Sequence, residues 1–250
     1  MNELALFAGA GGGLLGGKLL GWRTVCAVER DAYAAQILAQ RQTDGLLPAF
    51  PIWSDVCSFD GRPWRGLIDV VSGGFPCQDI SAAGNGLGLA GSRSGLWREM
   101  ARITDEIRPR YLELENSPLL VGRGLALVLG DIAKMGYDAW WGVMGAADFG
   151  APHQRDRIWL IAEDTSQKMA NSRSEHVKRI LPCRADSQIG GRPIERSPRS
   201  RRDGIGWWSS EPGMGRVADG MAYRVDRLKA LGNGQVPVVA ARAFELLSTS

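Results

Sequence analysis

The chain has 250 residues (27.1 kDa), of which 44% are hydrophobic and 23% charged, as in an ordinary globular protein. This length suits one medium domain with a small appendage, and the composition excludes a disordered, collagen-like or disulfide-stapled chain. No apolar run reaches the roughly 18 residues of a membrane span. Because Met1-Asn2-Glu3 lacks the basic start of a signal peptide, we expect a cytoplasmic protein without a membrane anchor.

The net charge of +3 is unevenly distributed along the chain. Residues 165–224 carry twelve Lys/Arg and six Asp/Glu, a charge of +6 that leaves −3 for the rest. A basic segment of this kind favours an anionic partner. Only two histidines are present and the four cysteines are widely spaced, so we expect no metal site.

Short apolar runs alternate with helix-like stretches over the first 164 residues. The runs expected to form strands are Leu4–Phe7, Thr24–Val28, Ile68–Val71, Tyr111–Leu114 and Ile158–Ala162. The stretches expected to form helices are Leu14–Gly21, the segment from its cap Asp31 to Gln42, Leu96–Ile107 and Leu119–Met135. Alternation of helices with strands that are apolar throughout predicts a doubly wound α/β fold with a mostly parallel sheet.

The character of the sequence changes after residue 164. Residues 165–210 are rich in Ser, Arg, Gly and Pro, which is typical of a disordered basic linker. The aromatic pair Trp207 and Trp208 indicates that the later part packs against another surface. Helical periodicity returns at Val236–Leu247. We therefore expect three parts with boundaries at 1–164, 165–225 and 226–250.

A glycine-rich loop, residues 7–13, joins the first predicted strand to the first predicted helix. Ligands of open parallel sheets bind beyond the carboxyl ends of the strands, where glycines let the backbone approach a cofactor. Glu29 ends the second strand, twenty residues after Gly9, where a carboxylate can accept hydrogen bonds from ribose hydroxyls. This combination favours a nucleoside cofactor. The loop has no basic side chain and no strict G-x-G-x-x-G, which favours S-adenosylmethionine over NAD. Asp55 can contact an adenine amino group or cap a helix.

Cys77 lies in the loop Gly73-Gly74-Phe75-Pro76-Cys77-Gln78-Asp79-Ile80-Ser81, directly after the predicted strand Ile68–Val71. The loop should therefore lie at the same sheet edge as the glycine loop. A lone cysteine is usually a small core residue. Proline and polar neighbours are a poor setting for core packing, and a thiolate attacks electron-poor carbon, so Cys77 is a candidate nucleophile.

These motifs resemble, in their order along nearly the whole chain, those of the cytosine-C5 DNA methyltransferases of bacterial and phage type. The matching elements are Phe7–Gly12 (cofactor loop), Glu29 (ribose-binding acid), Asp55-Val56 (adenine contact), Gly74–Gln78 (nucleophile loop), Glu115-Asn116 (Glu-Asn-Val element), Pro152–Arg157 (Arg-x-Arg element) and Gly232–Val236 (closing motif). Two departures are visible. Ser117-Pro118 follows Asn116 in place of the family's valine, and the variable segment after the Arg-x-Arg element is short.

The resemblance implies a DNA (cytosine-5-)-methyltransferase with a Rossmann-like sheet that uses S-adenosylmethionine. It implies that Cys77 adds to C6 of a flipped cytosine, that Glu115 hydrogen-bonds or protonates N3, and that C5 then takes the methyl group. Arg157 would meet the cytosine O2, and Arg155 a phosphate or the covalent adduct. We expect these two arginines to project from one side of a strand, as i, i+2 neighbours do.

The resemblance also assigns the remaining binding roles. The expected cofactor-binding residues are Phe7, Gly9, Gly11, Gly12, Glu29, Asp55, Pro76 and Asn233. The expected DNA-binding residues are Gln78, Ser81, Arg199, Arg201 and Arg202. Residues 1–164 would form the cofactor-binding and catalytic domain, residues 165–225 a small basic target-recognition region, and residues 226–250 a segment packing back on the catalytic domain. The partner would be double-stranded DNA, bound by a monomer, with a possible cognate restriction endonuclease.

Three other functions fit parts of this pattern. An RNA cytosine methyltransferase is built on the same motifs. An inactive nucleic-acid-binding relative would keep the fold alone, although it would have no need of Cys77, Glu115, Arg155 and Arg157. A nicotinamide-dependent oxidoreductase would use the glycine loop and Glu29.

Overall fold

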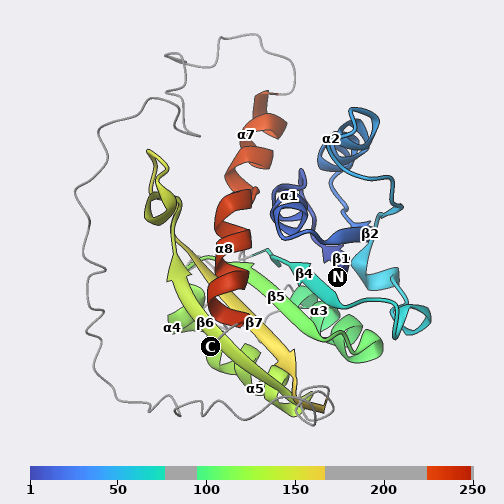
Figure 1. The fold of residues 1–250 in the computed structure, drawn as a ribbon, viewed down its shortest axis with the longest axis vertical. Helices are drawn as coiled ribbons and strands as arrows, with labels where there is room; N and C mark the ends of the chain where they lie inside the picture. Colours follow the sequence, from blue (N-terminus) through green and yellow to red (C-terminus); the bar gives the residue numbers. More distant parts are fainter. Residues whose placement is uncertain (77–94, 167–223, 249–250) are drawn as a thin grey trace.

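The computed structural model describes residues 1–76, 95–166 and 224–248, which form a seven-stranded sheet with helices on both faces (Figure 1). The strands are β1 (Asn2–Leu6), β2 (Arg23–Val28), β3 (Ile52–Trp53), β4 (Val70–Gly73), β5 (Tyr111–Asn116), β6 (Tyr137–Met144) and β7 (Arg157–Asp164). The helices are α1 (Gly12–Leu19), α2 (Ala32–Thr43), α3 (Gly95–Ile107), α4 (Leu120–Arg123), α5 (Leu125–Lys134), α7 (Arg224–Asn233) and α8 (Pro237–Ser248). No helix in these ranges is long and apolar enough to cross a membrane.

The strand order is β3-β2-β1-β4-β5-β7-β6, and the first five strands are parallel. Within the sheet β7 runs against its two neighbours, with Glu115 of β5 paired to Trp159. The predicted doubly wound, mostly parallel α/β fold is confirmed. The reversal of β7 matters for function, because it brings the start of that strand to the edge where the parallel strands end.

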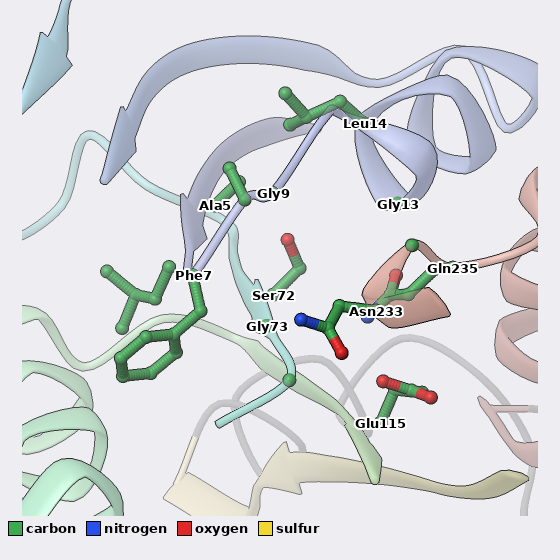
Figure 2. Close-up of a pocket in the computed structure, with 14 residues that line it drawn as sticks. Ala5, Phe7, Gly9, Gly13, Leu14, Ser72, Gly73, Glu115, Asn233 and Gln235 are labelled. Carbon is green, nitrogen blue, oxygen red and sulfur yellow. The ribbon is translucent and has the colours of Figure 1, made fainter. Parts of the chain in front are cut away.

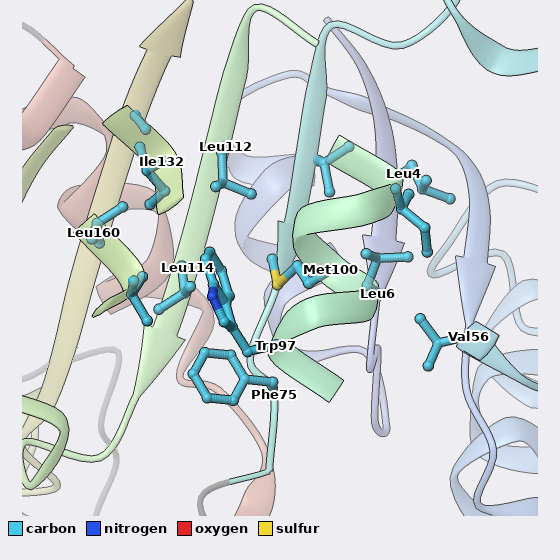
Figure 3. Close-up of a cluster of buried hydrophobic side chains, with 14 of the residues drawn as sticks. Leu4, Leu6, Val56, Phe75, Trp97, Met100, Leu112, Leu114, Ile132 and Leu160 are labelled. Atoms are coloured by element: carbon cyan, nitrogen blue, oxygen red, sulfur yellow. The ribbon is translucent and has the colours of Figure 1, made fainter. Parts of the chain in front are cut away.

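Side-chain alternation along each strand divides the core between the two faces of the sheet. Leu112 and Leu114 of β5 face α3, where Trp97 and Met100 are fully buried against them (Figure 3). Tyr111 of the same strand faces the opposite side and meets Phe244 of α8 edge to face, with ring centroids 5.3 Å apart. Helices α3 and α5 therefore cover one face, and α1 and α8 the other.

The last helix is held tightly against the first. A Cβ atom at Gly16 of α1 would lie 2.8 Å from the Cβ of Ala240 and 2.9 Å from the carbonyl oxygen of Pro237, so only glycine allows this approach. Helix α8 also packs on β7, and Phe244 contacts Trp22, with ring centroids 4.7 Å apart. The start of α8 thus lies beside the glycine loop, and its later residues lie beside Trp22.

Four elements differ from the sequence-based expectation, and the first is the two-residue edge strand β3, which was not predicted. The single helix predicted over 119–135 is two helices, because Gly124 between them is fully extended (φ −178) and glycine resists helix formation. Strand β6 was not predicted; it is an edge strand with weak alternation in its burial. Helix α7 was not predicted either, since it follows the polar segment directly.

Two carboxyl groups are buried between the sheet and α1. Glu3 accepts hydrogen bonds from the hydroxyls of Ser72 (2.6 Å) and Thr24 (2.9 Å). Glu113 is also buried, and its Oε1 has no hydrogen-bond partner among the described residues. Burial raises the pKa of both groups, and the Glu3 carboxyl raises the pKa of Glu113 further. Glu113 therefore keeps its proton to higher pH than an exposed glutamate does.

Replacing Glu113 with leucine is expected to stabilise the protein by about 1–3 kcal/mol, the cost of a buried polar group without a partner. The folded chain keeps the Glu113 proton that the unfolded chain releases near its ordinary pKa of 4.5. Wild-type stability should therefore fall as pH rises above 4.5 through the raised folded-state pKa, and less so in the variant. Urea unfolding across this pH range measures the difference. Replacing the surface residue Glu245 with glutamine should leave the pH dependence intact. An unchanged pH dependence in the Glu113 variant would contradict this assignment.

Candidate active site

The glycine loop and Glu29 lie together at the carboxyl edge of the parallel strands. Phe7, Gly9 and Gly11 have positive φ values of 54, 55 and 86, which lets the chain turn sharply from β1 into α1. The two carboxylate oxygens of Glu29 accept hydrogen bonds from the backbone N–H of Gly9 (2.6 Å) and of Asp31 (2.7 Å). Glu29 thus fixes the glycine loop and the start of α2 in one arrangement.

A pocket opens between this loop, the end of β4 and the loop before α8 (Figure 2). Figure 2 shows Glu115, Asn233 and Gln235 drawn near one another, with Ser72 on β4 and Phe7 at the start of the glycine loop also bordering the pocket. Among the described residues no Lys or Arg side chain lines the pocket. Its lining is Ala5, Leu6, Phe7, Ala8, Gly9, Gly13, Leu14, Ser72, Gly73, Gly74, Glu115, Asn233, Gly234 and Gln235.

Five of the expected cofactor residues lie outside this lining, among them Glu29, which holds the glycine loop from behind through Gly9. Gly11 and Gly12 serve packing, because a Cβ atom would lie 2.7 Å from Leu38 at the first and 2.2 Å from the Gln235 carbonyl oxygen at the second. Asp55 caps the short 3-10 helix Val56–Ser58 by accepting a hydrogen bond from the backbone N–H of Cys57 (3.0 Å). Pro76 is exposed at the end of the described loop.

Glu115 is the last residue but one of β5, lies beside the pocket and is paired with an arginine. Its Oε1 lies 2.9 Å from Nε of Arg157, the first residue of β7. Burial raises the pKa of the Glu115 carboxyl, and the positive charges of Arg157 and Arg155 and a hydrogen bond from Gln235 oppose that rise. A carboxyl balanced in this way can hold or share a proton with a bound group.

The expectation that Arg155 and Arg157 share one side of a strand is wrong. Arg155 precedes β7 and has a left-handed backbone (φ 45), so the i, i+2 relation of a strand does not apply. Its guanidinium donates to the carbonyl oxygens of Gly232 (2.8 Å) and Gly234 in the loop before α8. Both arginines still act electrostatically on Glu115, but Arg155 is occupied in holding this loop.

The loop that leads to Cys77 is anchored next to Glu115. Phe75 is buried against Trp97, with ring centroids 5.7 Å apart, and its carbonyl oxygen accepts a hydrogen bond from Nδ2 of Asn116 (3.0 Å). Ser117 donates its backbone N–H to Oδ1 of the same Asn116 side chain (2.8 Å). The Ser-Pro departure from the family pattern therefore leaves the acid and the amide in place.

The sequence analysis did not single out Gln235. Its side chain lies beside Glu115, and it lines both the pocket and a smaller hollow beside Arg155 and Arg157. The available signal was its place in the closing motif, two residues after Asn233.

Several expected site residues lie outside the described residues, and their roles stay predictions. They are Cys77, Gln78, Ser81, Arg199, Arg201 and Arg202. Within 1–76, 95–166 and 224–248, no three His, Cys, Asp or Glu side chains are grouped as a metal ion would require.

Two solved structures share the fold. A protein encoded in an E. coli prophage and assigned as a DNA modification methyltransferase matches with a TM-score of 0.56 and 26% identity, over 67% of this chain and 48% of that one. The S. pombe Dnmt2 methyltransferase matches with a TM-score of 0.54 over 65% of this chain and 50% of that one, and at 18% identity this likeness shows the fold alone.

Curated relatives are similar over about two thirds of the chain. The Type II methyltransferase M.Eco47II of Escherichia coli is 36% identical over 168 residues, which cover 64% of this chain and 38% of that protein. M.PspPI of Psychrobacter sp. (strain TA137) is 32% identical over 187 residues, which cover 70% and 43%. The matches thus span less than half the length of these two relatives. The family model of the C-5 cytosine-specific DNA methylases matches residues 1–192. With that match over most of its length, and with the motifs of the family gathered at one sheet edge, this chain belongs to the C-5 cytosine-specific DNA methylase family.

Proposed function

We propose that this protein is a DNA (cytosine-5-)-methyltransferase, which transfers a methyl group from S-adenosylmethionine to C5 of cytosine in double-stranded DNA. One observation carries the proposal. The Glu115–Arg157 pair lies at the same sheet edge as the glycine-loop pocket, beside the anchored loop that leads to Cys77.

The lining of the pocket fits S-adenosylmethionine. Phe7 and Leu14 offer apolar contact, Ser72 and Asn233 offer polar groups, and the described lining has no cation to meet a pyrophosphate. A cofactor with a cationic sulfonium and no phosphate suits such walls better than a dinucleotide. When bound, S-adenosylmethionine supplies an electrophilic methyl group. Phe7, Gly9 and Asn233 would border it, and Glu29 would shape the loop that receives it.

The side chains of this protein would prepare the base for methylation. The Cys77 thiolate forms a bond to C6 of cytosine, and Glu115 gives N3 a hydrogen bond or a proton, so that electrons move towards C5. Arg157 keeps the Glu115 carboxyl aimed and offers donors to the cytosine O2. After C5 has gained the methyl group, it loses its proton, the bond between Cys77 and C6 breaks, and the thiolate returns.

The substrate base would have to leave the duplex, at a cost of a few kcal/mol. We assign residues 165–225 as the basic target-recognition region, because its charge of +6 over 165–224 suits phosphate contact. Residues 1–164 would form the catalytic domain and residues 226–250 the segment that returns to it. Methylation by a monomer, accompanied by a restriction endonuclease in the same cell, is part of this proposal.

Nucleoside mass spectrometry tests the proposed reaction directly. The full chain is incubated with S-adenosylmethionine and mixed-sequence duplex DNA, and a parallel reaction contains tRNA. We expect 5-methylcytosine in the DNA and none when S-adenosylmethionine is omitted. Methylation of tRNA alone would replace the proposal with an RNA methyltransferase. Cofactor binding without transfer to either substrate would indicate an inactive relative.

Glu29→Gln is expected to weaken S-adenosylmethionine binding by roughly tenfold or more, because one charge-assisted hydrogen bond becomes weaker or is lost. In wild type the carboxylate accepts from two backbone N–H groups, and the amide of the variant can accept through only one atom. Isothermal titration calorimetry measures the affinity. Asp44→Asn, at the far end of α2, is the matched control. Equal affinities of Glu29→Gln and wild type would exclude Glu29 from shaping the cofactor site.

A further inference from the structure

Gln235 occupies the wall between the cofactor pocket and the Glu115–Arg157 pair. It lines the pocket together with Gly13 and Glu115, and it lines the hollow on the other side together with both arginines. Figure 2 shows its side chain between Gly13 of the glycine loop and Glu115. Gln235, in the loop before α8, therefore lies against both the cofactor pocket and the Glu115–Arg157 pair.

The glycine loop is shaped to receive this residue. A Cβ atom at Gly12 would lie 2.2 Å from the carbonyl oxygen of Gln235, and one at Gly13 would lie 2.3 Å from its Oε1. Real Cβ atoms do not approach so closely, so both positions require glycine while Gln235 stays where it is. The two glycines thus leave the space that the backbone and the side chain of Gln235 occupy.

The amide end of Gln235 points to the catalytic carboxyl. A Cβ atom at Gly74 would lie 2.7 Å from Oε2 of Glu115 and 3.4 Å from Nε2 of Gln235, which places these two groups beside the same point. Arg157 binds the other oxygen, Oε1, at 2.9 Å. Arg157 thus faces one carboxyl oxygen, and the amide nitrogen of Gln235 lies on the side of the other.

We propose that Gln235 is a positioning residue for Glu115, holding the carboxyl in the orientation in which it meets the target base. The backbone of the Gln235 loop is held separately, because Arg155 donates to the carbonyl oxygens of Gly232 and Gly234. The side-chain amide of Gln235 is therefore not needed to hold its own loop and can interact with Glu115. This inference rests on the proposed function for the identity of the base.

A titration of Glu115 tests the contact without any turnover. The carboxyl infrared band that disappears in Glu115→Gln belongs to Glu115, and its intensity against pH gives the midpoint. The groups acting on Glu115 are Arg157 and Arg155, from the start of β7 and the residues before it, and Gln235. Gln235→Met keeps the length of the side chain but removes the donor, so the midpoint should rise by roughly one pH unit. Gln235→Glu adds a like charge and should raise it further.

Turnover gives the second measurement. Gln235→Met should lower kcat roughly tenfold or more, the effect of losing one hydrogen bond to a charged group, with little change in the KM for S-adenosylmethionine. Gln40→Met, which removes an exposed amide–carboxylate contact on α2, is the control and should behave as wild type. Thermal melting of both variants checks that they fold.

The outcomes separate this inference from the proposed function. An unmoved Glu115 midpoint in folded Gln235→Met overturns the positioning role, even if activity falls, because a purely structural role would lower activity alone. A wild-type protein that methylates neither DNA nor RNA overturns the proposed function and leaves the infrared titration measurable.

Discussion

Cys77→Ala is expected to abolish methyl transfer while leaving S-adenosylmethionine binding unchanged. Without a thiolate no bond forms at C6, and C5 of cytosine remains too weak a nucleophile to take the methyl group. Cys77 itself lies outside the described residues, but Phe75, two positions earlier, is buried and tied to Asn116, next to Glu115. The chain is thus held next to Glu115 two residues before the proposed nucleophile.

Mass spectrometry of the DNA and calorimetry with S-adenosylmethionine measure the two halves of this prediction. Cys57→Ser is the matched control, because Cys57 is an exposed thiol whose pKa is raised by partial burial and by Asp55. A thiol with a raised pKa is a poor nucleophile at neutral pH. Duplex DNA containing 5-fluorocytosine adds a direct readout. Its C5 has no proton to lose after methylation, so wild type should stay covalently attached in a denaturing gel. Methyl transfer by Cys77→Ala would contradict the mechanism.

Glu115→Gln should lower kcat by roughly 100-fold or more, the scale of general acid–base catalysis by a positioned side chain. The amide keeps the shape of the carboxyl but can neither hold nor release a proton. Burial raises the pKa of Glu115, so the wild-type group keeps a proton to higher pH than an exposed glutamate does. The ionisation belonging to Glu115 should therefore appear above 4.5 in the pH profile of kcat and be missing from the variant.

A matched control for Glu115→Gln exists on the neighbouring strand. Glu163, at the far end of β7, is also buried and paired with an arginine, Arg110, at 3.1 Å. Glu163→Gln removes a comparable ion pair at the opposite edge of the sheet, so it should cost stability but leave kcat unchanged. Equal rates for Glu115→Gln and wild type would remove Glu115 from the chemistry.

Much of the fold was predictable because its signals are local. The Asp31 cap is confirmed, since its carboxylate accepts from the backbone N–H groups of Tyr33 and Ala34, both at 3.1 Å. Apolar runs identified five strands of the sheet, and most helix boundaries fall close to those observed. The edge strands β3 and β6 were missed because the first has only two residues and the second alternates weakly in burial. The split at Gly124 was missed because a single glycine inside an apolar helical pattern does not by itself predict a break.

The candidate site was predictable in its parts but not in its assembly. Residue type and order along the chain identified the glycine loop, Glu29, Glu115 and the Arg-x-Arg element. Their assembly depends on strand direction. If β7 ran parallel to β5, Arg157 would lie at the opposite ends of the strands from Glu115. Because β7 is antiparallel, its first residue lies beside the end of β5, next to Glu115.

The fold class and the family could be predicted from the amino-acid sequence, because short-range apolar patterns and motif order do not depend on distant contacts. The roles of individual side chains became visible only in the folded chain. Arg155 holds the loop before α8, since its left-handed backbone turns it away from the strand geometry. Gln235 lies beside Glu115 because α8 packs closely on α1. Gly12, Gly13 and Gly16 allow this packing, since a side chain at any of them would clash with Gln235 or with α8. Contacts between residues from twenty to more than a hundred positions apart have no local signature, and they are the ones that build this site.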